Sequence, residues 1–222
     1  MKNPIPHIIR GNTFWISPDR SLYWEEENTL LIADLHLGKS GHFRKAGIPV
    51  PQNVYKADLQ RLMARLYFYK ADRLIIAGDF THSTANRELE LFLKWRKDFS
   101  GLQIDLVKGN HDILSDGWYL EANIRISSHT LQAGPFLILH DLKDQLKLTP
   151  EQKKLYHFAG HLHPGVLLKG LARQSMKLPC FYFTPTYCVL PAFSRFTGNL
   201  MVKPAKGEQV YVIAGDEVTL LT

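Results

Sequence analysis

Five short runs of nearly continuous apolar residues follow one another along the chain, at 29–33, 73–77, 104–108, 136–139 and 156–159. Most of these runs are rich in β-branched residues, and glycine, aspartate or asparagine lies close to their ends, which is typical of strands. Because polar residues hardly alternate with the apolar ones, we expect both faces of these strands to be buried.

Helical spacing occurs between the early runs. The segments 52–69 and 86–99 place apolar residues three or four positions apart and charged residues on the other side. The first half of the chain therefore alternates strand and helix, which indicates an α/β layered fold. After Leu167, aromatic and β-branched stretches predict antiparallel strands, which an N-terminal pair around 13–16 and 22–24 is expected to join. No linker is evident, so we predict one domain over 1–222.

The composition is that of a folded protein, with 45% hydrophobic and 22% charged residues among 222. Lys and Arg outnumber Asp and Glu by 27 to 21, a mild excess that is compatible with a polyanionic partner but does not establish one. The two cysteines, Cys180 and Cys188, imply no disulfide framework and are expected to be reduced core residues. No signal peptide or membrane-length apolar run is evident, so we predict a cytoplasmic protein without a membrane partner.

Polar side chains with metal-binding or proton-transfer chemistry follow every predicted strand. In chain order they are Asp34 and His36; Asp79 and His82; Asn110, His111 and Asp112; His140 and Asp141; and His161 and His163. In open α/β sheets the carboxyl ends of the strands line the ligand crevice. One such residue is usually an ordinary loop residue, whereas five signatures in succession predict a shared site.

The chemistry of these residues favours a divalent metal site. Carboxylate and amide oxygens together with imidazole nitrogens suit Mn, Fe, Co or Zn. Because strand side chains alternate, we expect Asp34 and His36 to share one side of an extended segment, and His161 and His163 to do the same. The two oxygens of Asp79 can bridge two ions, and two metals about 3.5–4 Å apart form a clamp for phosphoryl chemistry.

The ordered set Asp-x-His, Gly-Asp, Gly-Asn-His-Asp, His and Gly-His-x-His, from Asp34 to His163, resembles the calcineurin-like metallophosphoesterases. More narrowly, the stretches ADLHLGKSGHFRKAGIPVP, GDFTHS, GHLHP and LPAFSRFTGN are similar to the bacterial subgroup of ligase-associated DNA-damage-response endonucleases (the PdeM subgroup). With these stretches the resemblance extends over most of the chain.

The resemblance implies a four-layer αββα sandwich, two β-sheets flanked by helices, that holds two divalent ions, with manganese first and iron, cobalt or zinc as alternatives. Asp34, His36 and His163 would hold the first ion, Asn110, His140 and His161 the second, and Asp79 would bridge them. His111 would not be a ligand; it would face the scissile phosphate and protonate the leaving oxygen. Asp112 would hydrogen-bond the His111 imidazole, and His82 would orient the site.

Substrate contacts follow from the same resemblance. The loop over 38–51 would cover the metal face, where Arg44 or Lys45 would contact a phosphate oxygen, unless the loop is simply a solvated basic segment. Arg195 is a weaker candidate of the same kind. Asp141 departs from many family members, which have glycine there. It is either a surface turn residue or a negative charge near the second ion that disfavours a phosphomonoester dianion.

The predicted function is metal-dependent hydrolysis of phosphodiesters, in DNA or in a nucleotide, with a role in DNA repair linked to a DNA ligase and a helicase. A second interpretation is hydrolysis of a nucleotide-linked pyrophosphate, although the sequence has no obvious amphipathic lid. A third is a non-catalytic interaction scaffold of the same fold, against which His111 and the full ligand set argue. The sequence does not indicate the oligomeric state.

Overall fold

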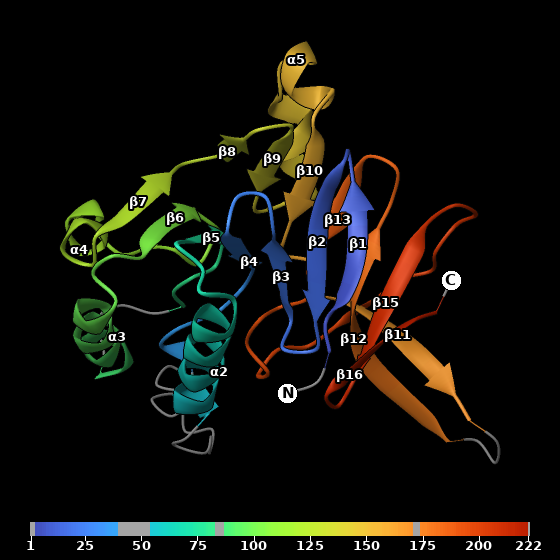
Figure 1. Cartoon of the computed structure of the whole chain (residues 1–222), viewed down its shortest axis with the longest axis horizontal. Helices are drawn as coiled ribbons and strands as arrows, with labels where there is room; N and C mark the ends of the chain where they lie inside the picture. The colour runs from blue at the N-terminus through green and yellow to red at the C-terminus, as the bar shows by residue number, and fades with distance from the viewer. Residues whose placement is uncertain (1–2, 40–53, 83–86, 171–173, 222) are drawn as a thin grey trace.

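The structure, a computed structural model, describes residues 3–39, 54–82, 87–170 and 174–221. Within these residues two β-sheets pack against one another (Figure 1). The first sheet has seven strands that are neighbours in chain order: β1 (Ile5–Ile9), β2 (Asn12–Ser17), β3 (Ser21–Trp24), β4 (Thr29–Ile32), β5 (Arg73–Ala77), β6 (Gln103–Val107) and β7 (Ile124–Ser127). Neighbours are antiparallel from β1 to β4 and parallel from β4 to β7.

The second sheet has the order β14-β11-β12-β13-β10-β9-β8, and β15 pairs with both β12 and β16. Its strands are β8 (Thr130–Ala133), β9 (Phe136–Leu139), β10 (Tyr156–Ala159), β11 (Pro164–Lys169), β12 (Ser175–Phe183), β13 (Tyr187–Val189), β14 (Leu200–Met201), β15 (Gln209–Ala214) and β16 (Glu217–Leu220). All five strands predicted from apolar runs are present, but β9 and β10 lie in this sheet. The N-terminal pair β2 and β3 instead joins the first sheet, because β3 pairs directly with β4.

Helices lie on the outside of both sheets in the described part of the chain. The first sheet is covered by α2 (Val54–Tyr69), α3 (Arg87–Asp98) and α4 (Asp116–Glu121). The helices α2 and α3 confirm the two predicted ones, apart from positions 52, 53 and 86, which lie outside the described residues. Among the described residues, the second sheet is covered by the 3-10 helix η1 (Leu142–Lys147) and the short α5 (Pro150–Lys153) alone, so the fourth layer is thin there. No described helix is long and apolar enough to span a membrane.

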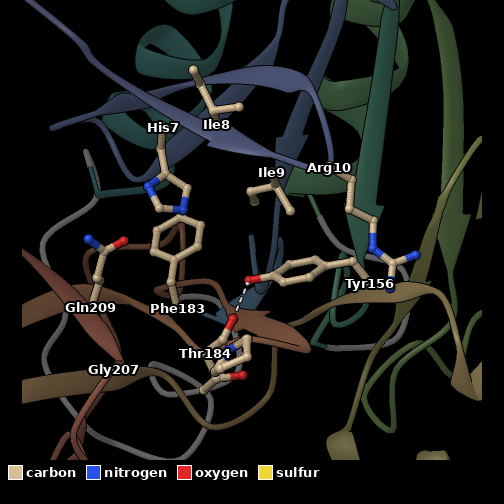
Figure 2. A pocket seen from close by; sticks show the side chains of 10 residues that line it. His7, Ile8, Ile9, Arg10, Tyr156, Phe183, Thr184, Gly207 and Gln209 are labelled. Atoms are coloured by element: carbon tan, nitrogen blue, oxygen red, sulfur yellow. Dashed lines mark hydrogen bonds between the residues drawn. The ribbon is translucent and has the colours of Figure 1, made fainter.

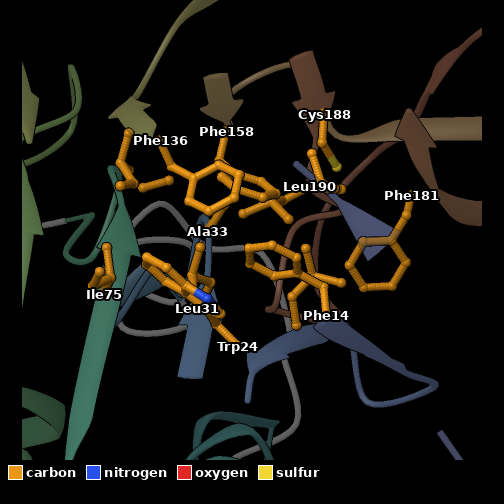
Figure 3. Close-up of a cluster of buried hydrophobic side chains, with 14 of the residues drawn as sticks. Phe14, Trp24, Leu31, Ala33, Ile75, Phe136, Phe158, Phe181, Cys188 and Leu190 are labelled. Carbon is orange, nitrogen blue, oxygen red and sulfur yellow. The ribbon is translucent and has the colours of Figure 1, made fainter. Parts of the chain in front are cut away.

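The packing of the sheets explains why the predicted strands are apolar on both faces. In β4, Leu30 and Ile32 are buried in the cluster with α2 and α3, whereas Leu31 and the following Ala33 are buried between the sheets. Aromatic rings from both sheets fill the space between them, as Figure 3 shows for Phe14, Trp24, Phe136, Phe158 and Phe181. Cys188 belongs to the same core, and both cysteines are buried and free, which confirms the prediction for them.

Candidate metal centre

The candidate site lies where the carboxyl ends of β4, β5 and β6 meet those of β9 and β10. Backbone hydrogen bonds join neighbouring ends within each sheet: Asp34 N donates to Gly78 O in the first sheet, and Gly160 N donates to His140 O in the second, both at 3.0 Å. The carboxylate of Asp34 joins the two sheets, because His161 N donates to its Oδ2 at 3.0 Å. The predicted ligands therefore meet at the junction of two sheets rather than along one sheet edge.

The backbone turns into the left-handed region at these strand ends. Positive φ angles occur at Asp34 (54°), His36 (53°), Asp79 (49°), His161 (65°) and His163 (46°). Such angles are uncommon for residues other than glycine, and the strain they store clusters at functional sites. The prediction that each Asp-x-His or His-x-His pair lies along an extended segment is therefore wrong, because the chain curls at each ligand instead of alternating.

Glycines make room for the ligand side chains. Gly78 has a φ of +80°, and a Cβ atom there would lie 2.0 Å from His140 Nδ1. A Cβ atom at Gly109 would lie 2.3 Å from Asp79 Oδ1. Side chains at either glycine would displace a candidate ligand, so both positions require the absence of a Cβ, and Gly78 also adopts a backbone angle that favours glycine.

The first group of candidate ligands is Asp34, His36 and His163, whose donor atoms lie within 4.8 Å of one another. His163 Nε2 is 3.5 Å from Asp34 Oδ1. His36 is buried, and neither of its ring nitrogens has a hydrogen-bond partner among the described residues. Burial, with Lys39 nearby, lowers the pKa of His36 far below its usual range, which keeps the imidazole neutral. Buried unpartnered nitrogens beside a carboxylate fit a metal ion.

The second group is Asp79, His140 and His161, again within 4.8 Å, and Asn110 adjoins it. His140 Nε2 lies 3.1 Å from Asn110 Oδ1, 3.1 Å from His161 Nδ1 and 3.5 Å from Asp79 Oδ1. His140 Nδ1 lies 3.2 Å from the carbonyl oxygen of Ala77. If Nδ1 carries the proton and donates it to Ala77 O, Nε2 has a lone pair and acts as an acceptor. The three atoms near Nε2 can also be acceptors, so a cation between them would satisfy all four.

Asp141 contacts the second group from outside. Its Oδ1 accepts a hydrogen bond from Lys143 N at 3.0 Å, which caps η1, and its Oδ2 lies 3.5 Å from His161 Nε2. Asp141 is therefore a turn residue and also a negative charge next to a candidate ligand, so the two alternatives from the sequence do not exclude one another, and the effect on a phosphomonoester stays a prediction. A proton on His161 Nε2 directs the lone pair of Nδ1 toward the other donors.

His111 and His82 lie beside the first group without belonging to either set of donors. The His111 ring centroid is 4.1 Å from that of His82 and 5.7 Å from that of His36. The backbone of His111 is fixed because its N–H donates to Asp79 Oδ1 at 2.9 Å. An imidazole held next to the ligands but outside both groups can contact a substrate.

Asp112 does not hold the His111 imidazole as predicted. Its Oδ1 accepts hydrogen bonds from Thr81 N at 2.8 Å and Thr81 Oγ1 at 3.0 Å, and its Oδ2 accepts from Gly109 N at 2.9 Å and Phe80 N at 3.3 Å. These four donors occupy the buried carboxylate, so it ties the loop after β5 to the loop after β6. Among the described residues, these donors of the two loops take the place of the predicted His111 ring.

The predicted substrate contacts are placed only in part. Arg44 and Lys45 lie outside the described residues. Arg195 is exposed on the loop between β13 and β14, and it lines a pocket with Lys39. The backbone N–H of Lys39 donates to His36 O at 3.2 Å, so this pocket adjoins the first group of ligands.

Two arginines that the sequence analysis did not single out hold the loop that carries Arg195. Arg20 Nη1 donates to Ala192 O at 3.1 Å and to Ser194 O at 2.8 Å. Arg61 donates to Phe193 O, and its guanidinium lies 4.3 Å from the centroid of the Phe193 ring. No local motif marks these arginines, because their partners are 132 to 174 positions away.

A second pocket lies away from the metal centre, at the amino end of β10. It encloses about 290 Å³, and Figure 2 shows His7, Arg10, Tyr156 and Phe183 among the side chains that line it. Tyr156 OH donates to Thr184 O at 3.1 Å beside it. None of the predicted site residues in the described part lines this pocket, so it is separate from the metal centre.

Comparison with known proteins is consistent with this geometry. The calcineurin-like phosphoesterase family matches residues 28–177. The crystal structure of the Pseudomonas putida nuclease MPE shares 30% sequence identity with the chain at a TM-score of 0.83, covering 99% of this chain and 100% of that one. No curated protein matches the chain.

Two further solved structures are more distant. A Streptococcus pneumoniae protein described as a predicted phosphoesterase has 13% identity and a TM-score of 0.35 over 86% of each chain. The zinc complex of Entamoeba histolytica Vps29 has 12% identity and a TM-score of 0.38 over 86% of this chain and 96% of that one.

Proposed function

Because the chain belongs to the calcineurin-like phosphoesterase family, and is thus a metal-dependent hydrolase of phosphoester bonds, we propose that it cleaves phosphodiester bonds in DNA. The observation that carries this proposal is the pair of donor groups beside an imidazole, His111, that belongs to neither group. The likeness to the Pseudomonas putida nuclease over nearly the whole chain supports a nucleic-acid substrate.

We assign the donors as the sequence predicted. Asp34, His36 and His163 hold one divalent ion, Asn110, His140 and His161 hold the other, Asp79 bridges them, and manganese suits this mixture of oxygen and nitrogen ligands. Two such ions, when bound, activate water and neutralise phosphate oxygens. The residues themselves exclude most solvent, since Asp34, His36, Asp79 and His140 are all buried.

Proton transfer to the leaving oxygen is assigned to His111. Its ring lies against His82, which limits how it can turn, and its backbone is fixed by Asp79. Asp112 supports His111 indirectly, because its carboxylate accepts a hydrogen bond from Gly109 N and so holds the loop that carries His111. The cytoplasmic location, the single domain and the link to a DNA ligase and a helicase stay predictions.

The proposal is tested with small and polymeric substrates. With Mn²⁺, the protein is expected to hydrolyse bis-p-nitrophenyl phosphate faster than p-nitrophenyl phosphate, to cleave single-stranded or gapped DNA, and to lose all of these activities in EDTA. Activity confined to mononucleotides or nucleotide-linked pyrophosphates would contradict the DNA substrate and leave the metal centre intact. No hydrolysis of any phosphoester with any divalent ion would indicate a non-catalytic scaffold.

Asp141→Asn is expected to weaken binding of one of the two ions. The Asn oxygen still accepts from Lys143 N, so the cap of η1 stays, but the negative charge that orients His161 is lost. Loss of such an outer carboxylate typically costs about 10–100-fold in metal affinity. Titration of the metal-free protein with Mn²⁺ measures both affinities. Asp144→Asn, on the same helix but paired with Lys147, is the control and should match the wild type.

If both Mn²⁺ affinities of Asp141→Asn equal those of the wild type, Asp141 does not orient His161 for metal binding, and its role is to cap η1. The same variant also tests the second alternative from the sequence. If the carboxylate repels a phosphomonoester dianion, the ratio of monoester to diester hydrolysis should rise in the variant and stay constant in Asp144→Asn.

A further inference from the structure

The segment 192–194, which we call the bracing segment, lies along the backbone that follows β4. Its first residue forms a parallel β-bridge with Ala33. Phe193 N donates to Ala33 O at 2.7 Å, and Ser194 N donates to Asp34 O at 3.2 Å. All three residues of the segment are buried. The bracing segment therefore pairs with the chain at the point where it delivers Asp34 to the metal centre.

The conformation of Asp34 depends on contacts of this kind. Its φ angle of 54° lies in the left-handed region, which residues other than glycine adopt only where the surroundings hold them there. The N–H of Asp34 donates to Gly78 O, and its carbonyl oxygen accepts from Ser194 N. The first of these bonds comes from the end of β5 and the second from the bracing segment. Loss of the second would free the peptide that sets the direction of the Asp34 carboxylate.

Two guanidinium groups bind the carbonyl oxygens of the bracing segment. Arg20, in the turn between β2 and β3, donates to Ala192 O at 3.1 Å and to Ser194 O at 2.8 Å. Arg61, on α2, donates to Phe193 O, and its Cζ lies 4.3 Å from the centroid of the Phe193 ring. The bracing segment is thus joined to the end of β4 through its amides and to two other elements through its carbonyls.

Both arginines are held away from solvent while they carry their charge. The side chain of Arg61 is 8% exposed and pairs with the buried Asp58 at 2.9 Å, and Asp58 also accepts from the Ser194 hydroxyl. Burial, together with the like charge of Arg61, lowers the pKa of Arg20 to about 10, so Arg20 stays charged at neutral pH. Buried ion pairs add little net stability. The position that the arginines give to the bracing segment explains them better than a gain in stability does.

We propose that Arg20 and Arg61 are positioning residues for the first metal ion. They fix the bracing segment, the segment fixes Asp34, and a correctly turned Asp34 gives the first group of ligands its affinity. The ligands of the second ion that follow β6, β9 and β10 are carried by other strand ends, so the second ion should depend on the arginines far less. This inference rests on the place of Asp34 in the metal centre under the proposed function, and it adds residues outside the centre that control the affinity.

Titration of the metal-free protein with Mn²⁺ tests the proposal without turnover. Arg20→Met removes two hydrogen bonds to the bracing segment and keeps a long side chain. The affinity for the first ion should fall about 10-fold, the lower end of the losses caused by removing an outer partner of a metal ligand. The affinity for the second ion should change far less. Arg20→Lys keeps a charged donor and should lose less affinity than Arg20→Met.

Two backgrounds identify which ion is affected. His140→Ala lacks a ligand of the second ion, and His36→Ala lacks a ligand of the first. Arg20→Met should weaken the remaining Mn²⁺ site in the His140→Ala background and leave the remaining site unchanged in the His36→Ala background. A general loss of stability would not distinguish the two backgrounds.

Arg96→Met is the matched control. Arg96 is a buried arginine that also binds backbone carbonyls, those of Ala122 at 3.0 Å and Leu102 at 2.7 Å, but it lies on α3 and its partners lie outside the bracing segment. The variant should keep both Mn²⁺ affinities even where its melting temperature falls. The comparison separates loss of a buried arginine from loss of the brace on Asp34.

Arg61→Met combined with Asp58→Asn serves if Arg20→Met does not fold, because the double change leaves no buried carboxylate without its partner. It should weaken the first ion in the same direction. Wild-type affinity for both ions in Arg20→Met and in the double variant would overturn the proposal, and so would an equal loss of both ions. The proposed function fails separately, if the wild-type protein with both ions bound hydrolyses no phosphodiester.

Discussion

Asp79→Ala is expected to lose most of both metal ions and, with them, the hydrolysis of diesters. Asp79 is buried, and its Oδ1 lies 3.5 Å from His140 Nε2 in the second group of ligands. A bridging carboxylate serves each ion, so its removal lowers the affinity of both and also removes the negative charge that offsets two adjacent cations. Elemental analysis of the purified variant measures the metal content directly.

The design separates metal binding from folding. Asp79 Oδ1 also accepts from His111 N, so Asp79→Asn is the companion variant that keeps an acceptor of similar size there. Asp105→Asn is the control: Asp105, in β6, is similarly buried, but it pairs with Arg73 of β5 and Arg125 of β7, and the variant should keep both ions. Loss of one ion only would make Asp79 an ordinary ligand. Unchanged metal content would remove it from the centre.

The sequence predicted the strands and the two long helices because these elements have strong local patterns. The runs that became β4 and β5 are apolar on both faces, since one face packs on α2 and α3 and the other lies between the sheets. Likewise, Leu62 and Phe92 are buried at the helical spacing from which α2 and α3 were predicted. Periodicity in these segments reflects burial directly, so it could be identified without a structure.

Contacts between distant segments could not be predicted in this way. The assignment of β9 and β10 to a second sheet depends on pairing with β13 and β8, which no local pattern specifies. The clamp that Arg20 and Arg61 form on residues 192 to 194 has the same origin. Long-range partners are chosen by the whole fold, and a short window of sequence does not contain them.

The ligand types were predictable, whereas their geometry was not. Asp34 and His36 were identified as donors by chemistry, yet their φ angles of 54° and 53° contradict an extended segment. Left-handed backbone at residues other than glycine is strained and has no clear sequence signal. Asp112 shows the same limit, because which donors a carboxylate finds depends on loops from two strands.

His111→Ala should keep both ions and lose turnover. His111 is in neither group of donors, so metal content should equal that of the wild type. Its ring lies near His36 and against His82, where it can reach the leaving oxygen of a bound phosphate. General acid catalysis is typically worth about 10²–10⁴-fold, so kcat on a DNA oligonucleotide should fall by this factor. His129→Ala, which removes an exposed histidine between β7 and β8, is the matched control.

The leaving group distinguishes proton transfer from other roles of His111. A DNA alkoxide needs a proton to depart, whereas p-nitrophenolate is stable without one, so His111→Ala should lose less kcat on bis-p-nitrophenyl phosphate than on DNA. An equal loss on both substrates would indicate that His111 stabilises charge on the phosphate instead of protonating the leaving oxygen. Near-wild-type kcat on DNA would remove His111 from catalysis. If His111→Ala loses metal in parallel with activity, His111 is a ligand, because removal of a ligand lowers the metal content and kcat together.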